Sequence, residues 1–284
     1  MNDASRYDRP MAQPDPLFTG IIVGTDGSER ADAAVLQGAR FASMSEARLG
    51  ILYVIDTGRP LDQGDEPRPN EALARAMVLA EKASATADAR MVSGDPAVML
   101  LEEANEKGVD LLCVGSDAGL MRGPRIGRVA SRVLREASCS VLVARSSEAD
   151  FPSRMVCGID GSDVSANVAA VGVAIAAAAQ AQIQLVHAIP FFEPRARRRI
   201  RFEALSSLEL EQSLIAAKAG GVVPSHAVVR GRADRAPVKV TKRSRSDLLA
   251  VGRRGMSGTQ RMLLGSVSQY CARKATCSVL VSHP

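Results

Sequence analysis

Short apolar runs alternate with longer segments of helical periodicity along the chain. In the second half, apolar runs lie near 154–159, 183–189, 225–229, 247–252 and 278–282, and helical segments near 163–181, 200–219, 233–243 and 266–275. Runs such as Leu248–Val251 lack polar alternation, which is typical of strands buried on both faces. The alternation predicts an α/β fold of doubly wound, mostly parallel five-stranded sheets with helices on both faces (Rossmann-like).

The same pattern occurs twice. Gly24–Ser28 (GTDGS) returns 134 residues later as Gly158–Ser162 (GIDGS), and Cys139–Val143 returns 138 residues later as Cys277–Val281. A nearly constant offset indicates two copies of one domain. The predicted organisation is a flexible N-terminal arm (1–16), a first domain (17–146) and a second domain (152–284).

Composition narrows the class of protein. Hydrophobic residues make up 46% and charged residues 24%, as in ordinary globular proteins. Aromatic residues are 3% with no Trp, so stacking platforms are few and nucleic acid is an unlikely ligand. The five cysteines include no C-x-x-C pair, which argues against a disulfide framework, and no spacing indicates a metal site.

The apolar runs also include neither a signal peptide nor a membrane-spanning segment. Residues 1–16 contain no apolar run that could act as a signal peptide. The uncharged apolar run Val168–Ala179 is too short to span a bilayer. We therefore expect a cytoplasmic protein without a membrane segment.

Charge differs between the two halves. Residues 1–150 carry 17 basic and 23 acidic side chains, whereas residues 151–284 carry 19 and 8. The second half could face an anion or an acidic partner, or surface charge could simply have drifted. The run Arg195–Arg201 could touch nucleic acid or an acidic partner, although a solvated loop is the simpler interpretation.

Polar residues follow the first strand of each copy. In open α/β sheets ligands bind at the carboxyl ends of strands, where strand order reverses. Asp160-Gly161-Ser162, and Asp26 in the first copy, stand at such an end. The Asp could bind a sugar hydroxyl or base amine, or it could shape the turn and cap the next helix. On its own the motif favours the structural role.

A glycine loop follows the fourth strand of the second copy. Gly252, Gly255, Gly265 and Ser266 give the spacing G-x2-G-x9-G-S, which matches neither a Walker A motif nor G-x-G-x-x-G. Glycines allow positive φ and close approach, and we expect a Cβ at Gly252 or Gly255 to occupy phosphate space. Ser266 opens a helix whose N–H groups suit phosphate, but Ser266–Gln269 also reads as a capping box.

Together these motifs resemble the universal stress protein family, and more narrowly its tandem members. The resemblance covers about 265 residues, everything after the N-terminal arm. It implies a member that binds ATP, with or without Mg²⁺, with adenosine near the first two strands and phosphates on the glycine loop. The residues implied are Gly158, Asp160, Ala188, Gly252, Gly255, Gly265, Ser266 and Val267.

The first copy departs from the motif. Its loop is one residue shorter with a displaced second glycine, Arg128 stands in place of Ser266, and Asp117 adds a negative charge. Arg128 could fill the site, or its charge could instead attract phosphate, and Asp117 would repel phosphates. Because the steric and geometric losses should outweigh any attraction, we expect one nucleotide per chain, in the second domain. The weaker candidates in the first domain are Gly24, Asp26, Val54, Gly115 and Gly127.

Two functions remain open from the sequence. One is a stress-response sensor or regulator whose state depends on a bound adenine nucleotide, and the alternative is a ligand-free interaction scaffold of the same fold. No nucleophile arrangement can be read from the chain, which favours a binding protein over an enzyme and leaves slow ATP hydrolysis open. The resemblance also implies that the last strands, around Leu142 and Leu280, pair antiparallel in an intramolecular pseudo-dimer that could dimerise again.

Overall fold

The computed structural model describes most of both copies of the repeat. The described residues are 17–58, 68–116, 118–119, 123–124, 126–145, 151–189, 222–255 and 264–283. The arm over 1–16, the helix expected over 200–219, the run Arg195–Arg201 and Asp117 lie outside them. The first repeat below means the described residues up to 145, and the second repeat those from 151.

The first repeat alternates strands and helices. Its elements are β1 (Gly20–Thr25), α1 (Glu29–Ser45), β2 (Arg48–Asp56), α2 (Pro69–Lys82), β3 (Ala87–Gly94), α3 (Pro96–Glu106), β4 (Leu111–Gly115), α4 (Arg128–Glu136) and β7 (Ser140–Ala144). Two short strands, β5 (Ala118–Gly119) and β6 (Gly123–Pro124), pair antiparallel between β4 and α4.

The second repeat follows the same order. Its elements are β8 (Arg154–Ile159), α5 (Asp163–Ala179), β9 (Gln182–Ile189), β10 (Ser225–Arg230), α8 (Ala236–Ser244), β11 (Leu248–Gly252), α9 (Ser266–Lys274) and β12 (Ser278–Ser282). The strands expected from the sequence are all present within one residue of their predicted bounds. Helix α8 begins three residues later than predicted, because residues 233–235 form a turn before it.

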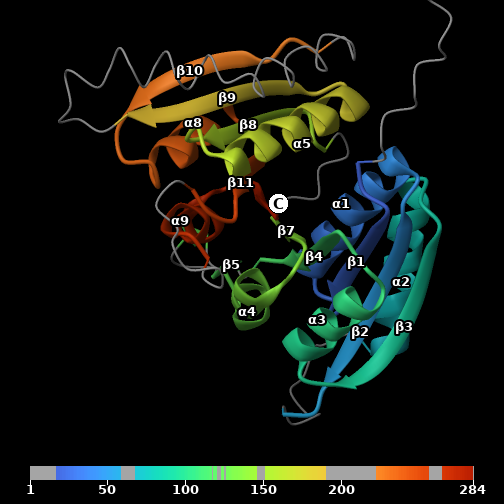
Figure 1. Ribbon diagram of the computed structural model, residues 1–284. Helices are drawn as coiled ribbons and strands as arrows, with labels where there is room; N and C mark the ends of the chain where they lie inside the picture. Colours follow the sequence, from blue (N-terminus) through green and yellow to red (C-terminus); the bar gives the residue numbers. More distant parts are fainter. Residues whose placement is uncertain are drawn as a thin grey trace, which may run out of the picture.

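The ten long strands make one sheet, in the order β10-β9-β8-β11-β12-β7-β4-β1-β2-β3 (Figure 1). Neighbouring strands are parallel within each repeat, which confirms the doubly wound, mostly parallel fold. The repeats meet where β12 pairs antiparallel with β7, with Leu280 opposite Leu142. The antiparallel pairing of the last strands, which the resemblance implied, is therefore present, and it covers two edges that would otherwise be open.

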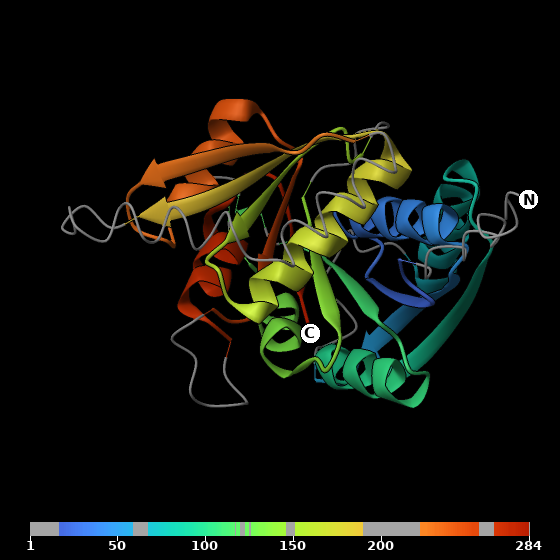
Figure 2. The ribbon, with the colours of Figure 1, turned by 45° about the horizontal axis from the view of Figure 1, so that its top comes forward.

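Two apolar layers cover the faces of the sheet, and both cross the boundary between the repeats. On one face α1, α2 and α5 pack on alternate strand residues, including Leu142 and Leu280. Figure 2 shows α5 crossing this face on the same side as α1. On the other face α3, α4, α8 and α9 pack on residues such as Val143 and Val279. Phe151 of the second repeat also contacts Phe41 of α1, with ring centroids 5.7 Å apart.

An aspartate joins the start of the first and fourth strands in each repeat. Asp110 Oδ2 accepts hydrogen bonds from the backbone N and the hydroxyl of Thr19 at 2.8 and 2.9 Å. Asp247 Oδ2 accepts the equivalent two bonds from Ser153, both at 2.7 Å. These contacts fix the register at the amino ends of the strands, so the opposite ends also come together in register.

Candidate functional site

Asp160 and Gly255 meet at the carboxyl edge of the second repeat. Asp160 follows β8, and Gly255 lies three residues after the end of the neighbouring strand β11. A Cβ added to Gly255 would lie 2.2 Å from Asp160 Oδ2, so the carboxylate lies directly against the loop backbone. The structure thus brings together two residues that are 95 positions apart in the sequence.

The structure shows the turn-shaping role considered for Asp160. Its Oδ1 accepts hydrogen bonds from Ser162 N at 3.1 Å and Ser162 Oγ at 2.6 Å. Ser162 Oγ in turn accepts from Ser165 N at 3.3 Å and caps α5, while Gly161 supplies the positive φ of 85° in the turn. One carboxylate oxygen therefore shapes the turn while the other faces the glycine loop.

The described loop glycines act through close packing, which corrects the sequence interpretation. Gly252, Gly255 and Gly265 are not among the positive-φ glycines. A Cβ at Gly252 would lie 2.7 Å from Val164 Cγ1 and 2.9 Å from the carbonyl of Arg254. The expectation that a Cβ at Gly252 or Gly255 would enter phosphate space is wrong, because protein atoms already occupy both positions.

The start of α9 also differs from the capping-box interpretation, which is wrong. Gly265 is the N-cap and Ser266 is the first helical residue, so Ser266 does not cap. Ser268 instead donates its buried hydroxyl toward the carbonyls of Gly252 at 2.6 Å and Arg253 at 3.0 Å. A glycine cap has no side chain to accept from the first N–H groups of the helix. Ser266, which is exposed, stands beside these N–H groups.

The other predicted residues lie along the same edge of the second repeat. Gly158 is the last residue but one of β8, and a Cβ there would lie 3.2 Å from Val251. Ala188 is in β9, and Val267 follows Ser266 in α9. His187 is buried in β9, and its Nδ1 lies 3.1 Å from the carbonyl oxygen of Ile159. A carbonyl can only accept, so Nδ1–H donates and ties the end of β9 to β8 beside Asp160.

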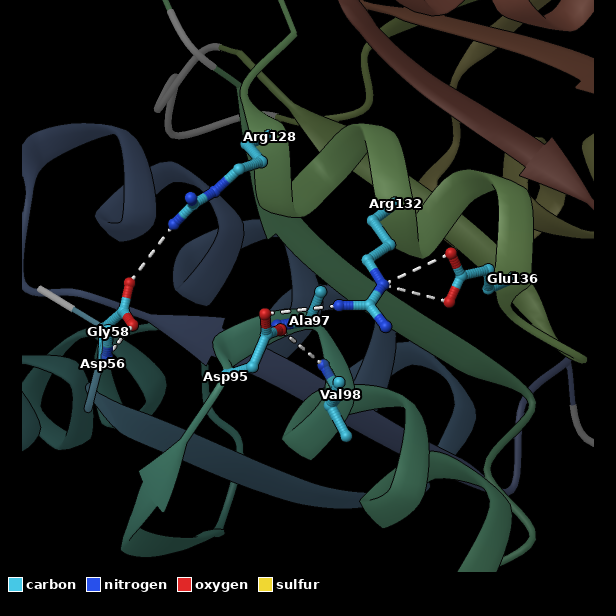
Figure 3. Close-up of polar contacts among 8 residues, drawn as sticks. All are labelled: Asp56, Gly58, Asp95, Ala97, Val98, Arg128, Arg132 and Glu136. Atoms are coloured by element: carbon cyan, nitrogen blue, oxygen red, sulfur yellow. Dashed lines mark hydrogen bonds and ion pairs between the residues drawn. The ribbon is translucent and has the colours of Figure 1, made fainter.

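The same edge of the first repeat is built differently. Arg128 is the first residue of α4, and its guanidinium pairs with Asp56 at the end of β2 at 3.3 Å (Figure 3). One turn further along α4, Arg132 pairs with Asp95 at 3.2 Å and with Glu136 at 3.1 Å. The side chain of Arg128 thus joins the start of α4 to the end of β2 along this edge.

The weaker first-repeat candidates keep their places in the fold. Asp26 makes the same turn as Asp160, with Oδ1 accepting from Ser28 N at 3.0 Å and Ser28 Oγ at 2.6 Å. Gly115 packs on the backbone of α1, because a Cβ there would lie 2.8 Å from the carbonyl oxygen of Arg30. Gly24 lies in β1, Val54 in β2, and Gly127 is the N-cap of α4.

Metal and thiol chemistry find no support in the described residues. They contain no group of three or more His, Cys, Asp or Glu side chains that could hold a metal ion. All five cysteines are buried free thiols, and burial raises the pKa of Cys139 and Cys277 to about 11. Cys139 and Cys277 stand at equivalent positions of the two repeats, and both are packed in the core. Among the described helices none is long and apolar enough to cross a membrane.

Two contacts at the site could not be anticipated from the sequence. Arg253 lies inside the glycine loop, yet its side chain reaches the backbone carbonyls of Arg135 and Ala137 in the first repeat. For Ser268 the sequence shows only a serine near the start of a helix, and it does not indicate the bonds to the carbonyls of Gly252 and Arg253. Both contacts join residues brought together by folding, so no spacing in the sequence announces them.

Comparisons with known proteins agree with this architecture. The family model of the universal stress protein family matches residues 18–145 and again 152–283. Universal stress protein Rv2005c of Mycobacterium tuberculosis is 32% identical over 93% of this chain and 97% of its own length. Rv2623 of the same organism is 28% identical, covering 93% and 96%. The crystal structure of a universal stress protein from Archaeoglobus fulgidus superposes with a TM-score of 0.67 at 17% identity, covering 93% and 97%.

Proposed function

The chain belongs to the universal stress protein family, and we propose that its second repeat binds ATP or a related adenine nucleotide. In this proposal the protein is a stress-response sensor or regulator whose state depends on whether that site is occupied. The observation that carries it is the contact of the Asp160 carboxylate with Gly255, beside the glycine-capped start of α9.

Each part of a nucleotide has a chemically suitable group here. The Oδ2 of Asp160 can accept hydrogen bonds from ribose hydroxyls or a base amine, and its place beside β9 suits the adenosine end. The N–H groups at the start of α9 and the Ser266 hydroxyl can donate to phosphate oxygens, and the helix dipole favours their negative charge. The basic second half of the chain favours an anionic ligand as well.

Magnesium would depend on the nucleotide itself. Mg²⁺ is often held by one or two carboxylates together with substrate phosphates and water. Asp160 is the described carboxylate nearest to the glycine loop, and its Oδ1 already accepts from Ser162. We therefore propose that ATP binds with Mg²⁺ carried mainly by its own phosphates.

The first repeat is proposed not to bind ATP. Arg128 replaces the serine at the helix start and pairs with Asp56, so a nucleotide would have to break this ion pair and move the side chain. Such an exposed pair is weak by itself, but the long side chain and the shorter loop also remove the geometry seen in the second repeat.

Isothermal titration calorimetry on nucleotide-stripped protein tests the proposal. We expect one equivalent of ATP per chain. Asp160→Ala should abolish binding or weaken it by at least about a hundredfold, because the carboxylate is the main proposed contact to adenosine and also orders the turn. Asp26→Ala is the matched control, since it removes the same turn contacts from the first repeat and should leave ATP affinity unchanged.

Two results would contradict this proposal. Two equivalents of ATP per chain would refute the assignment to the second repeat alone. Absence of any heat change or shift in melting temperature with millimolar ATP would favour the ligand-free scaffold. Mass spectrometry of any nucleotide that copurifies with the chain would identify the natural ligand directly.

A further inference from the structure

We propose that Arg253 is a positioning residue through which the first repeat holds the two described ends of the glycine loop of the second repeat, 252–255 and 264–266, in the geometry that binds nucleotide. This inference rests on the function proposed above and extends it. The first repeat, although its own loop is altered, then becomes a necessary part of the site in the second.

The backbone of Arg253 is the junction of the loop. Its N–H donates to the carbonyl of Ser282 at the end of β12, at 2.9 Å. Its carbonyl accepts from Gly265 N at 2.9 Å and from the hydroxyl of Ser268 at 3.0 Å. The residue therefore joins the end of β11, the end of β12 and the start of α9, and it stands two positions before Gly255.

The side chain of Arg253 fixes this junction to the other repeat. It is buried, with 7% of its surface exposed, and it donates to the carbonyls of Arg135 and Ala137. These carbonyls lie at the C-terminal end of α4, where the helix dipole favours a cation. Burial lowers the pKa of Arg253 because it penalises the charged form, in agreement with a desolvated contact.

Of the arginine contacts between the repeats described here, only the one made by Arg253 involves the glycine loop. The position equivalent to Arg253 in the first repeat is Ser116, whose short side chain has no comparable reach. The opposite contact between the repeats is made by Arg145, which donates to the carbonyls of Cys277, at 3.1 Å, and Ala272. Arg145 follows β7 and bonds to the end of α9 and the residue before β12, away from the glycine loop.

This pair of arginines supplies a matched test. Both are partly or fully buried, both donate to carbonyls at the end of the last helix of the other repeat, and only Arg253 belongs to the loop. Arg253→Met should leave two carbonyls of α4 without their donor and release the loop, whereas Arg145→Met should loosen the boundary between the repeats without touching the loop.

The experiment compares wild type, Arg253→Met, Arg145→Met and Arg253→Lys. We expect Arg253→Met to weaken ATP affinity by about tenfold or more, which corresponds to about 1.4 kcal/mol, and Arg145→Met to change it less than about twofold. Both should lower the melting temperature. Arg253→Lys keeps one charged donor and should recover part of the affinity.

Hydrogen exchange without ATP provides a second readout. The backbone amides at positions 253 and 265 should exchange faster in Arg253→Met than in wild type or in Arg145→Met. Unchanged exchange at these amides, or equal loss of ATP affinity in the two Met variants, would overturn the inference. If wild type does not bind ATP, the proposed function fails, and the exchange data still decide whether Arg253 positions the loop.

Discussion

At the scale of single residues, the two carboxylate oxygens of Asp160 have separate environments. Oδ1 is bound to Ser162 in the turn, and Oδ2 lies against Gly255. The turn holds the side chain in one orientation, which would reduce the entropy lost if the proposed nucleotide binds there. Gly255 sets how closely the loop can approach that oxygen.

Gly255→Ala should separate ligand affinity from stability. The added Cβ would meet the end of a side chain, which can shift only by weakening its bonds to Ser162, so the free energy of unfolding should fall by about 1 kcal/mol. ATP affinity should fall, because Asp160 loses its position. In Gly252→Ala the Cβ would instead meet the carbonyl of Arg254, and the unfolding free energy should drop by about 1–3 kcal/mol.

Urea denaturation and calorimetry on the two variants measure both quantities. A Gly255→Ala protein with unchanged ATP affinity would show that contact with Asp160 is not needed for binding. Equal destabilisation of the two variants would contradict the packing argument.

At the scale of elements, two serines near the start of α9 differ in burial and in hydrogen bonding. Ser268 is buried and bonds to the carbonyls of Gly252 and Arg253, so it holds the helix to the end of β11. Ser266 is exposed at the first helical position and makes no cap. The equivalent of Ser268 in the first repeat is Ala130, so this tie belongs to the second repeat.

The pair of substitutions Ser268→Ala and Ser266→Ala should therefore give opposite results. Ser268→Ala should lower the unfolding free energy by about 1–2 kcal/mol, since two carbonyls lose a buried hydroxyl donor. Ser266→Ala should stay within about 0.5 kcal/mol of wild type, yet weaken ATP binding through the lost hydroxyl. Thermal unfolding with and without ATP measures both effects, and a large loss of stability in Ser266→Ala would restore the capping interpretation.

At the scale of the whole molecule, the two repeats share one sheet and two apolar layers. Leu142 and Leu280 are fully buried opposite each other at the junction of β7 and β12. Because both layers continue across this junction, neither repeat has a core that is complete without the other.

Unfolding in urea should accordingly be a single transition, with the same midpoint when it is followed by circular dichroism and by hydrogen exchange. Leu142→Ala should lower the unfolding free energy of both repeats together, by about 2–5 kcal/mol. Val78→Ala on the exposed part of α2 is the control and should cost less than about 1 kcal/mol. Two separated transitions would show that the repeats are independent.

ATP at about 100 times its Kd should raise the free energy of unfolding of the whole chain by about 2.7 kcal/mol.

The sequence by itself determined the fold class and pointed to one candidate site. Continuous apolar runs such as Leu248–Val251 are typical of strands covered on both faces, and the internal repeat predicted that the pattern would occur twice. The rule that ligands bind at the carboxyl ends of strands directed attention to Asp160 and the glycine loop. These features are encoded by local periodicity and spacing, which survive without knowledge of the contacts.

Only the tertiary structure decided what each residue at the site touches. The sequence could not show that Gly255 lies on Asp160, that Ser268 rather than Ser266 holds the start of α9, or that Arg253 reaches α4 of the other repeat. Each of these contacts depends on register between distant strands and on the antiparallel joining of β7 and β12. Such contacts are fixed by packing of the whole sheet, and packing leaves no periodic signal in the chain.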